Sequence, residues 1–152
     1  LLRETSRSQL LDRVGHVREL VGDRAILRAL HFYEENERVD RALDALREEK
    51  IDRFLQQVSE SGQSSWTLLQ NCTVPAEPEQ SVALGLALSE TALDGHGACR
   101  VHGGGFAGTI LAFVSREKLN AYTALLEAVF GERSVSVLKV RGPGAGAINI
   151  DS

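Results

Sequence analysis

The stretch Arg100-Val-His-Gly-Gly-Gly-Phe-Ala-Gly-Thr109, followed directly by the apolar run from Ile110 to Val114, constrains the fold of this chain more than any other. Three consecutive glycines and a fourth at Gly108 lie between two strand-like segments. A backbone of this composition passes through positive φ angles or approaches another group closely. The stretch therefore predicts two strands joined by a glycine loop.

Length and composition describe an ordinary globular chain. Of its 152 residues, 43% are hydrophobic and 25% are charged, with a net charge of -4. Acidic and basic residues are interleaved, so we expect no nucleic-acid partner, which would need a clustered basic face. The apolar runs are too short for a membrane span. Cys72 and Cys99 form no C-x-x-C pair and no signal peptide is recognisable, so a reducing cytoplasm is the simplest setting.

The organisation changes along the chain. Most charged residues lie in residues 1–60, whereas most glycines lie from Gly85 onward. We expect a single domain over residues 1–152, with a helical part at about 1–61, a connection at about 62–77 and an α+β part at about 78–152. The chain begins at Leu1 and contains no Met. This predicts that it is a piece of a longer protein.

Apolar spacing predicts the helices of the first part. The residues that share helical faces are Leu10, Leu11, Val14 and Val17, then Ile26, Leu30 and Tyr33 giving way to Val39, Leu43 and Leu46, and then Ile51, Leu55 and Val58. The middle set drifts around the helix, which favours one long helix covered by different neighbours.

The second part predicts alternating helices and strands. Pro78 suits the first turn of a helix that runs to about Gly95. Strands are expected at Cys99–His102, Thr109–Val114, Val135–Val140 and Ile148–Ile150, with a helix between the second and third that Ser115 caps and Gly131 ends. The fold class is therefore α+β, a four-stranded antiparallel sheet with helices packed on one face, preceded by an N-terminal helical segment.

The glycine loop matches neither common phosphate motif. It lacks the G-x-x-x-x-G-K-[ST] order of a P-loop and the G-x-G-x-x-G spacing of a dinucleotide fold. From spacing alone, a tight hairpin and a ligand contact both remain open. Three glycines exceed what a hairpin needs, and Phe106 could pin the loop while its N–H groups face an anion.

In context, the loop resembles the third signature motif of the GHMP small-molecule kinases, and most closely that of the galactokinases. The family pattern is Arg, two further residues and Gly-Gly-Gly-Phe-Gly-Gly, and this chain has it from Arg100 to Gly108 with Ala107 in place of one glycine. A second stretch agrees: galactokinases carry Arg-Ala, His, Glu and Arg along a helix. The corresponding residues here are Arg28, Ala29, His31, Glu35 and Arg38.

The resemblance implies the C-terminal, ferredoxin-like domain of a galactokinase-like protein. The whole enzyme would transfer the γ-phosphoryl group of ATP, with Mg²⁺, to the anomeric hydroxyl of galactose. In such relatives the N-terminal half, absent here, holds the catalytic Asp, the sugar-binding residues and a further phosphate loop. Catalytic residues are thus expected in that half, and this chain alone is expected to be inactive.

The resemblance also implies the site residues. The nucleotide-phosphate loop comprises Gly103, Gly104, Gly105, Phe106, Ala107 and Gly108, supported by Arg100 and His102. The partners implied are ATP, a sugar and the protein's own N-terminal domain. The chain departs from galactokinases at Ser61-Gly62, where they commonly have Ser-His. Another sugar therefore stays open as the substrate.

Several other residues have both a structural and a functional interpretation. His31 with Glu34 or Glu35 has metal-ligand spacing but lacks a second pair, so a helix-face hydrogen bond is favoured and no metal site is expected. His102 is expected to fill the strand pleat rather than contact a phosphate, and Arg100 suits an ion-pair anchor.

The remaining candidates follow the same reasoning. Cys99 is expected to be a small buried hydrophobe. Trp66 is expected to cover the core, although it could line a sugar or nucleotide edge.

Two non-enzymatic hypotheses remain beside the kinase. Some galactokinase-like proteins act as sugar sensors that bind ATP and galactose and engage regulatory partners. Alternatively, the chain is a free-standing α+β interaction module that keeps the loop as a turn.

Overall fold

The structure is a computed structural model that describes residues 2–106 and 108–140. Its elements follow in the order η1 (Leu2–Glu4), α1 (Arg7–Asp12), α2 (Val14–Val21), α3 (Asp23–Arg47), α4 (Ile51–Ser64), the π-helix η2 (Ser65–Leu69), α5 (Ser81–Leu93), β1 (Gly97–His102), β2 (Thr109–Val114) and α6 (Leu119–Phe130). This composition confirms the α+β class. Within the described residues, every helix is too short or too polar to cross a membrane.

The N-terminal helices are two short ones rather than one. Ser6 caps α1, accepting from the N–H of Gln9 while the Gln9 side chain accepts from the Ser6 N–H. The chain then bends at Arg13, which ends α1 and precedes α2. The apolar face predicted over residues 10–17 is therefore divided between two helices.

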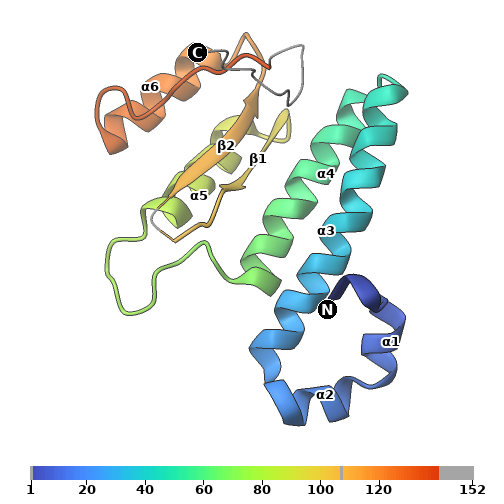
Figure 1. Ribbon diagram of the computed structural model, residues 1–152. Helices are drawn as coiled ribbons and strands as arrows, with labels where there is room; N and C mark the ends of the chain where they lie inside the picture. The colour runs from blue at the N-terminus through green and yellow to red at the C-terminus, as the bar shows by residue number, and fades with distance from the viewer. Residues whose placement is uncertain (1, 107, 141–152) are drawn as a thin grey trace, which may run out of the picture.

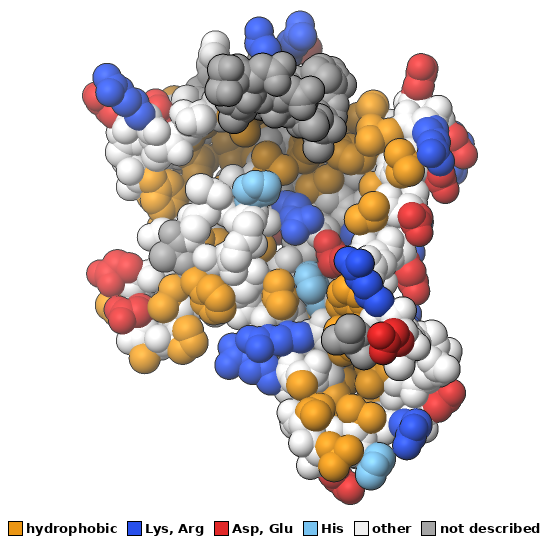
Figure 2. All heavy atoms as spheres, viewed as in Figure 1, with side chains coloured by type: hydrophobic (Ala, Val, Ile, Leu, Met, Phe, Trp, Pro, Cys, Tyr) orange, Lys and Arg blue, Asp and Glu red, His pale blue; other side chains and the backbone are white. Residues whose placement is uncertain are grey.

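The α3–α4 hairpin forms the long arm of the molecule (Figure 1). Helix α3 spans Asp23–Arg47, which confirms the predicted long helix, and its first half buries Ile26, Ala29 and Tyr33. The apolar stretch that begins at Val39 is exposed, with Val39 itself at 63%. The neighbouring segment that was expected to bury this stretch is not present among the described residues. Acidic and basic side chains are interspersed along the hairpin surface (Figure 2).

Helix α4 continues further than the sequence predicts. Gly62, expected to open the connection, is helical and buried, and the π-helix carries the chain on to Leu69. The reason is close packing, because a Cβ on Gly62 would lie 3.0 Å from the carbonyl oxygen of Cys99. Helix α4 thus lies directly against β1. The irregular connection is confined to residues 70–80.

Helix α5 begins at Ser81, three residues after the position predicted from Pro78. The Gln80 side chain holds the preceding turn closed by accepting from the Val74 N–H at 2.9 Å and donating to the Val74 carbonyl at 2.8 Å. It also donates to the Glu77 carbonyl. The segment before α5 is therefore a closed turn rather than a helical one.

The two strands pair antiparallel, with Gly97 opposite Val114 and His102 opposite Thr109. Helix α5 packs against both strands, and α4 packs along β1 (Figure 1). The core therefore lies where α5 packs against the β1–β2 pair. Its buried members are Cys72, Val82, Leu86, Leu93, Cys99 and Val101, with Val101 only 1% exposed.

The prediction of a four-stranded sheet is not supported. Residues 135–140, expected as the third strand, form no strand, and the fourth, at Ile148–Ile150, lies outside the described residues. Valine favours strands only where a neighbouring strand and a packing surface receive it. Val140 is instead 96% exposed.

The helix that follows the second strand was predicted more accurately. Helix α6 spans Leu119–Phe130, and Gly131 ends it with a φ of 95°, as expected. Ser115, however, lies one turn before the helix. Its carbonyl and hydroxyl oxygens both accept from the Lys118 N–H, so it closes the turn that precedes α6 and is not the N-cap.

Candidate functional site

The glycine loop leaves β1 after His102 and returns to β2 at Thr109. Gly103 and Gly105 have φ angles of 70° and 79°, whereas Gly104 is not among the residues with positive φ. The sign of φ therefore alternates along the three glycines. Backbones that alternate in this way can turn successive N–H groups toward one side and form anion-binding concavities.

The N–H groups of these three glycines are available. None of them donates to an acceptor in the described part of the chain. Gly103 and Gly104 are exposed, and space around the Cα atom of Gly104 is open, with no heavy atom within 4 Å of a Cβ built there. On an accessible surface, the loop thus presents N–H donors that no described residue accepts from. Ala107, predicted as part of this loop, lies outside the described residues.

Asn71 holds the loop from behind, an interaction that the sequence did not reveal. The Phe106 N–H donates to the Asn71 carbonyl oxygen at 2.6 Å, and the Asn71 side-chain amide donates to the Gly104 carbonyl at 3.1 Å. Asn71 is 3% exposed. A Cβ on Gly105 would lie under 3.0 Å from Asn71, so only glycine fits there. No motif marks Asn71, because its role depends on a contact between distant segments.

Phe106 does not pin the loop in the way the sequence suggests. The residue is 42% exposed, so it buries too little surface to anchor the loop. Its φ of 61° is uncommon for a bulky residue. The anchor is instead its backbone N–H on Asn71. Gly108 completes the turn by donating to the Gly105 carbonyl at 3.1 Å.

A polar cluster joins the two sequence stretches that resemble galactokinases. Glu35 on α3 accepts from the Ser61 hydroxyl on α4 at 2.7 Å and lies 3.7 Å from the Arg100 guanidinium on β1. It also pairs with Arg38 one turn along α3. The structure therefore brings the helix motif and the start of the glycine loop together. The ion pair predicted for Arg100 is present, with Glu35 as its partner, and its role as an anchor of the loop stays a prediction.

Arg38 is the most deeply buried charge of this cluster. It is 7% exposed and is flanked by Glu34 and Glu35 on its own helix. Its Nε atom lies 3.9 Å from a Glu60 oxygen and has no hydrogen-bond partner in the described part of the chain. Removing a carboxylate here would leave a buried cation poorly paired, and that is costly.

His31 belongs to the same junction. Its Nδ1 atom lies 2.9 Å from the Ser64 hydroxyl on α4, so its hydrogen bond crosses between helices. Burial lowers the pKa of His31 below its ordinary value of 6.5, and nearby Glu35 partly opposes that shift. Among the described residues, no three His, Cys, Asp or Glu side chains group together as metal ligands would.

The other candidates divide between core and surface. Cys99 is a buried core residue, as predicted, and burial raises the pKa of its thiol to about 11. His102 is exposed. It lies on the face of β1 opposite buried Val101, as the strand alternation predicts, and its relation to a phosphate stays a prediction. Trp66 packs partly buried against the core, which confirms the interpretation favoured from the sequence.

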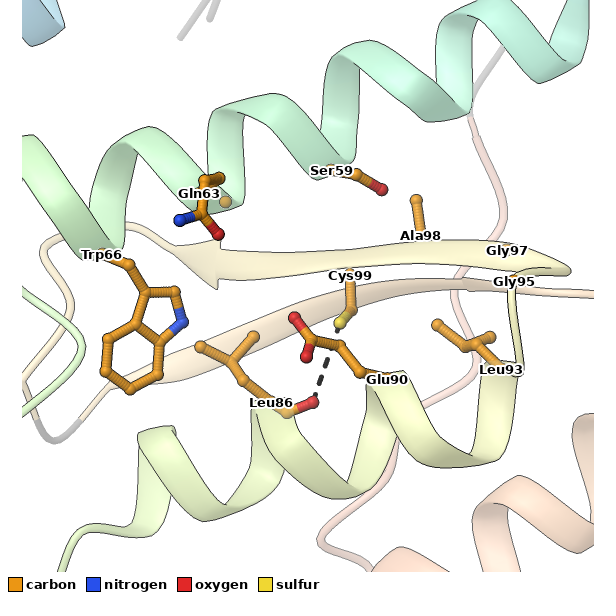
Figure 3. A pocket seen from close by; sticks show the side chains of 11 residues that line it. Ser59, Gln63, Trp66, Leu86, Glu90, Leu93, Gly95, Gly97, Ala98 and Cys99 are labelled. Carbon is orange, nitrogen blue, oxygen red and sulfur yellow. Dashed lines mark hydrogen bonds between the residues drawn. The ribbon is translucent and has the colours of Figure 1, made fainter.

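Two pockets flank Trp66 on the described surface. The first, of about 260 Å³, lies between α4, α5 and β1, and the second, of about 650 Å³, lies toward the start of α3. Figure 3 shows the first with its labelled side chains. Neither pocket is lined by the residues of the glycine loop. The loop therefore lies apart from both of these pockets.

Comparison with known proteins indicates the class. No protein-family model matches the chain. A galactokinase of Glaesserella parasuis serovar 5 (strain SH0165) is 30% identical over 125 residues, or 82% of this chain. The match covers 31% of that relative's length, so the chain spans about a third of it. The similarity indicates a sugar-kinase-like domain. More particularly, it supports a distant galactokinase-like relationship.

Proposed function

We propose that this chain is the C-terminal domain of a galactokinase-like sugar kinase. The full-length protein would transfer the γ-phosphoryl group of ATP to the anomeric hydroxyl of galactose. The observation that carries the proposal is the exposed loop with three consecutive N–H groups that have no acceptor among the described residues, in a chain distantly similar to a galactokinase. The role proposed for the loop is to donate hydrogen bonds to the nucleotide phosphates.

The residues present fit a phosphate ligand. Backbone N–H groups are preorganised donors that stabilise developing negative charge without reorganising during the reaction. Gly104 leaves room for close approach, and Asn71 fixes the loop from behind. Magnesium would neutralise phosphate charge when bound. We propose that the phosphates and the other domain hold it, since no metal-ligand group is found among the described residues.

The proposal assigns catalysis to the part of the protein outside this chain. Phosphoryl transfer depends on positioning and charge neutralisation, so one wall of a site contributes little rate by itself. We therefore expect this chain alone to consume no ATP with any sugar. In the full-length protein, the loop and the missing wall would enclose the phosphates between them.

A coupled assay of ATP consumption by the full-length protein tests this function. The wild type is measured against galactose and a panel of other sugars, then compared with Gly104→Val and with Gly15→Val. Both glycines stand in open space without positive φ, so Gly15→Val is the matched control. We expect turnover to fall at least about 10-fold in Gly104→Val only.

Two outcomes contradict the proposal. ATP binding with negligible consumption on every sugar would point to a sensor instead of a kinase. Equal activity of Gly104→Val and the wild type would show that the loop is a structural hairpin. A change of preferred sugar within the panel would revise the substrate and leave the reaction class standing.

A further inference from the structure

The pocket between α4, α5 and β1 has polar groups that the fold does not use. Its lining includes Ser59 and Gln63 on α4, Trp66 on the π-helix and Glu90 on α5 (Figure 3). The polar side-chain atoms of these four residues make no hydrogen bond within the described part of the chain. They stand around a hollow backed by core residues, and so they are available to a ligand.

The size of the pocket favours a small ligand. At about 260 Å³ it lies below the roughly 300–1,000 Å³ of sites that hold drug-sized molecules. Its floor is firm, because Leu86 and Cys99 line it and are both buried members of the core. A ligand of the size of a single sugar ring suits these dimensions.

The charge of the lining excludes anionic ligands. Glu90 is the one charged side chain that lines the pocket among the described residues, and it contributes to the raised pKa of the Cys99 thiol. Its negative charge thus reaches the pocket floor. A phosphate or nucleotide would find no cation here to compensate its own charge.

The hydrogen-bond donors and acceptors of the pocket lining distinguish between the two remaining ligand classes, organic ammoniums and neutral polyols. The Trp66 indole donates only, Glu90 accepts only when ionised, and Ser59 and Gln63 do both. An organic ammonium brings only donors and would leave the indole N–H without an acceptor. A neutral polyol brings hydroxyl groups that donate and accept, so it can satisfy all four side chains.

Trp66 provides the surface on which such a ring can lie. In Figure 3 the indole nitrogen is on the side of the ring that faces Glu90 and Cys99. The residue lies in a π-helix, Ser65–Leu69, a feature that often marks functional sites. A sugar ring has one face of C–H groups, which packs on an aromatic ring while its hydroxyls meet polar neighbours.

We propose that this pocket binds a neutral polyol of the size of a monosaccharide, stacked on Trp66 and hydrogen-bonded to Gln63 and Glu90. The proposal concerns a site separate from the glycine loop and does not depend on kinase activity. Sugars and cyclitols share the chemistry described, and a titration with each distinguishes them.

The test uses the intrinsic fluorescence of Trp66, because the chain contains a single tryptophan. D-galactose, D-glucose and myo-inositol are titrated into this chain, with ethylammonium and acetate as the cationic and anionic comparisons. The same titrations are repeated with Gln63→Ala, Glu90→Ala and the control Glu117→Ala. Glu117 is exposed and does not line the pocket. Circular dichroism confirms that each variant is folded.

We expect a saturable fluorescence change with at least one polyol and about 10-fold weaker binding in Gln63→Ala and Glu90→Ala. Glu117→Ala should bind as the wild type does. A response that stays linear with every polyol overturns the proposal. So does saturable binding of ethylammonium or acetate alone, or unchanged polyol affinity in both pocket variants. None of these results depends on ATP turnover, so failure here is distinguishable from failure of the kinase proposal.

Discussion

Glu35 lies 3.7 Å from Arg100, across the boundary between the α3–α4 hairpin and the strand that leads into the glycine loop. The same carboxylate accepts from Ser61 on α4. One side chain therefore connects three elements, the consecutive helices α3 and α4 and the more distant strand β1. The hairpin is tied to the base of the loop through charge as well as through the close packing of α4 on β1.

Replacing Glu35 should test how much this junction stabilises the fold. Glu35→Gln removes the charge that faces Arg100 and the buried Arg38, and we expect the free energy of unfolding to fall by about 1–3 kcal/mol. Glu37→Gln is the matched control, since Glu37 pairs with Arg41 on the exposed face of the same helix. It should change stability by less than about 0.5 kcal/mol. Urea unfolding measures both, and equal losses would contradict the role of Glu35.

Substitution by alanine should destabilise the fold strongly at one of two neighbouring glycines and hardly at the other. Gly105→Ala forces a Cβ onto Asn71 at a φ of 79°, so we expect a loss of about 2–4 kcal/mol. Gly104→Ala meets open space and should cost less than about 0.5 kcal/mol. Thermal and urea unfolding of the two variants give the comparison. Similar stability in both would show that Asn71 does not hold the loop as described.

The stability of the fold should depend on the protonation of His31. Burial lowers its pKa in the native state below 6.5, so the unfolded chain binds the proton more readily. The resulting stabilisation is complete above about pH 6.5 and is lost as the pH falls toward the native pKa. The free energy of unfolding of the wild type should therefore drop more steeply from about pH 7 to about pH 5 than that of His31→Gln.

His16→Gln provides the control for this pH dependence, because His16 is exposed on α2. Its profile should run parallel to that of the wild type. If the His31→Gln profile is also parallel, the histidine makes no contribution of the expected sign.

Both cysteines should resist alkylation in the native state. Burial raises the pKa of Cys99 from 9.0 to about 11 and also raises that of Cys72. Because the thiolate is the reactive form, iodoacetamide at about pH 8 should modify native Cys99 at least about 100-fold more slowly than unfolded Cys99. Mass spectrometry of the labelled peptides follows each thiol separately. Rapid labelling of native Cys99 would place it outside the core.

The elements that could be predicted were those that a local sequence pattern specifies, such as apolar periodicity or a glycine at a helix end. Periodic apolar residues predicted α3, and a glycine predicted the end of α6. The second strand was predicted with its observed bounds, Thr109–Val114. A strand at residues 135–140 was predicted from the spacing of its valines, and this failed because a strand also needs a partner edge. Gly62 misled the prediction of the α4 boundary, since its role is to allow a close approach of β1.

The candidate site was predictable only where a motif marked it. The glycine loop and the helix motif both stood out in the sequence. That Glu35 and Arg100 meet, and that Asn71 holds the loop, follows from tertiary contacts that no spacing rule contains. The pocket beside Trp66 was hidden for the same reason, because its walls come from segments separated along the chain.

The contact between Gly62 and the backbone of Cys99 limits how this chain can exchange residues with galactokinases, which commonly have histidine after the serine that corresponds to Ser61. A side chain at position 62 meets the carbonyl of Cys99 and the Cβ of Arg100 within 3.3 Å. A histidine introduced at this position therefore requires α4 and β1 to move apart by a few tenths of an ångström. Helix α4 and strand β1 therefore constrain each other's substitutions at this contact.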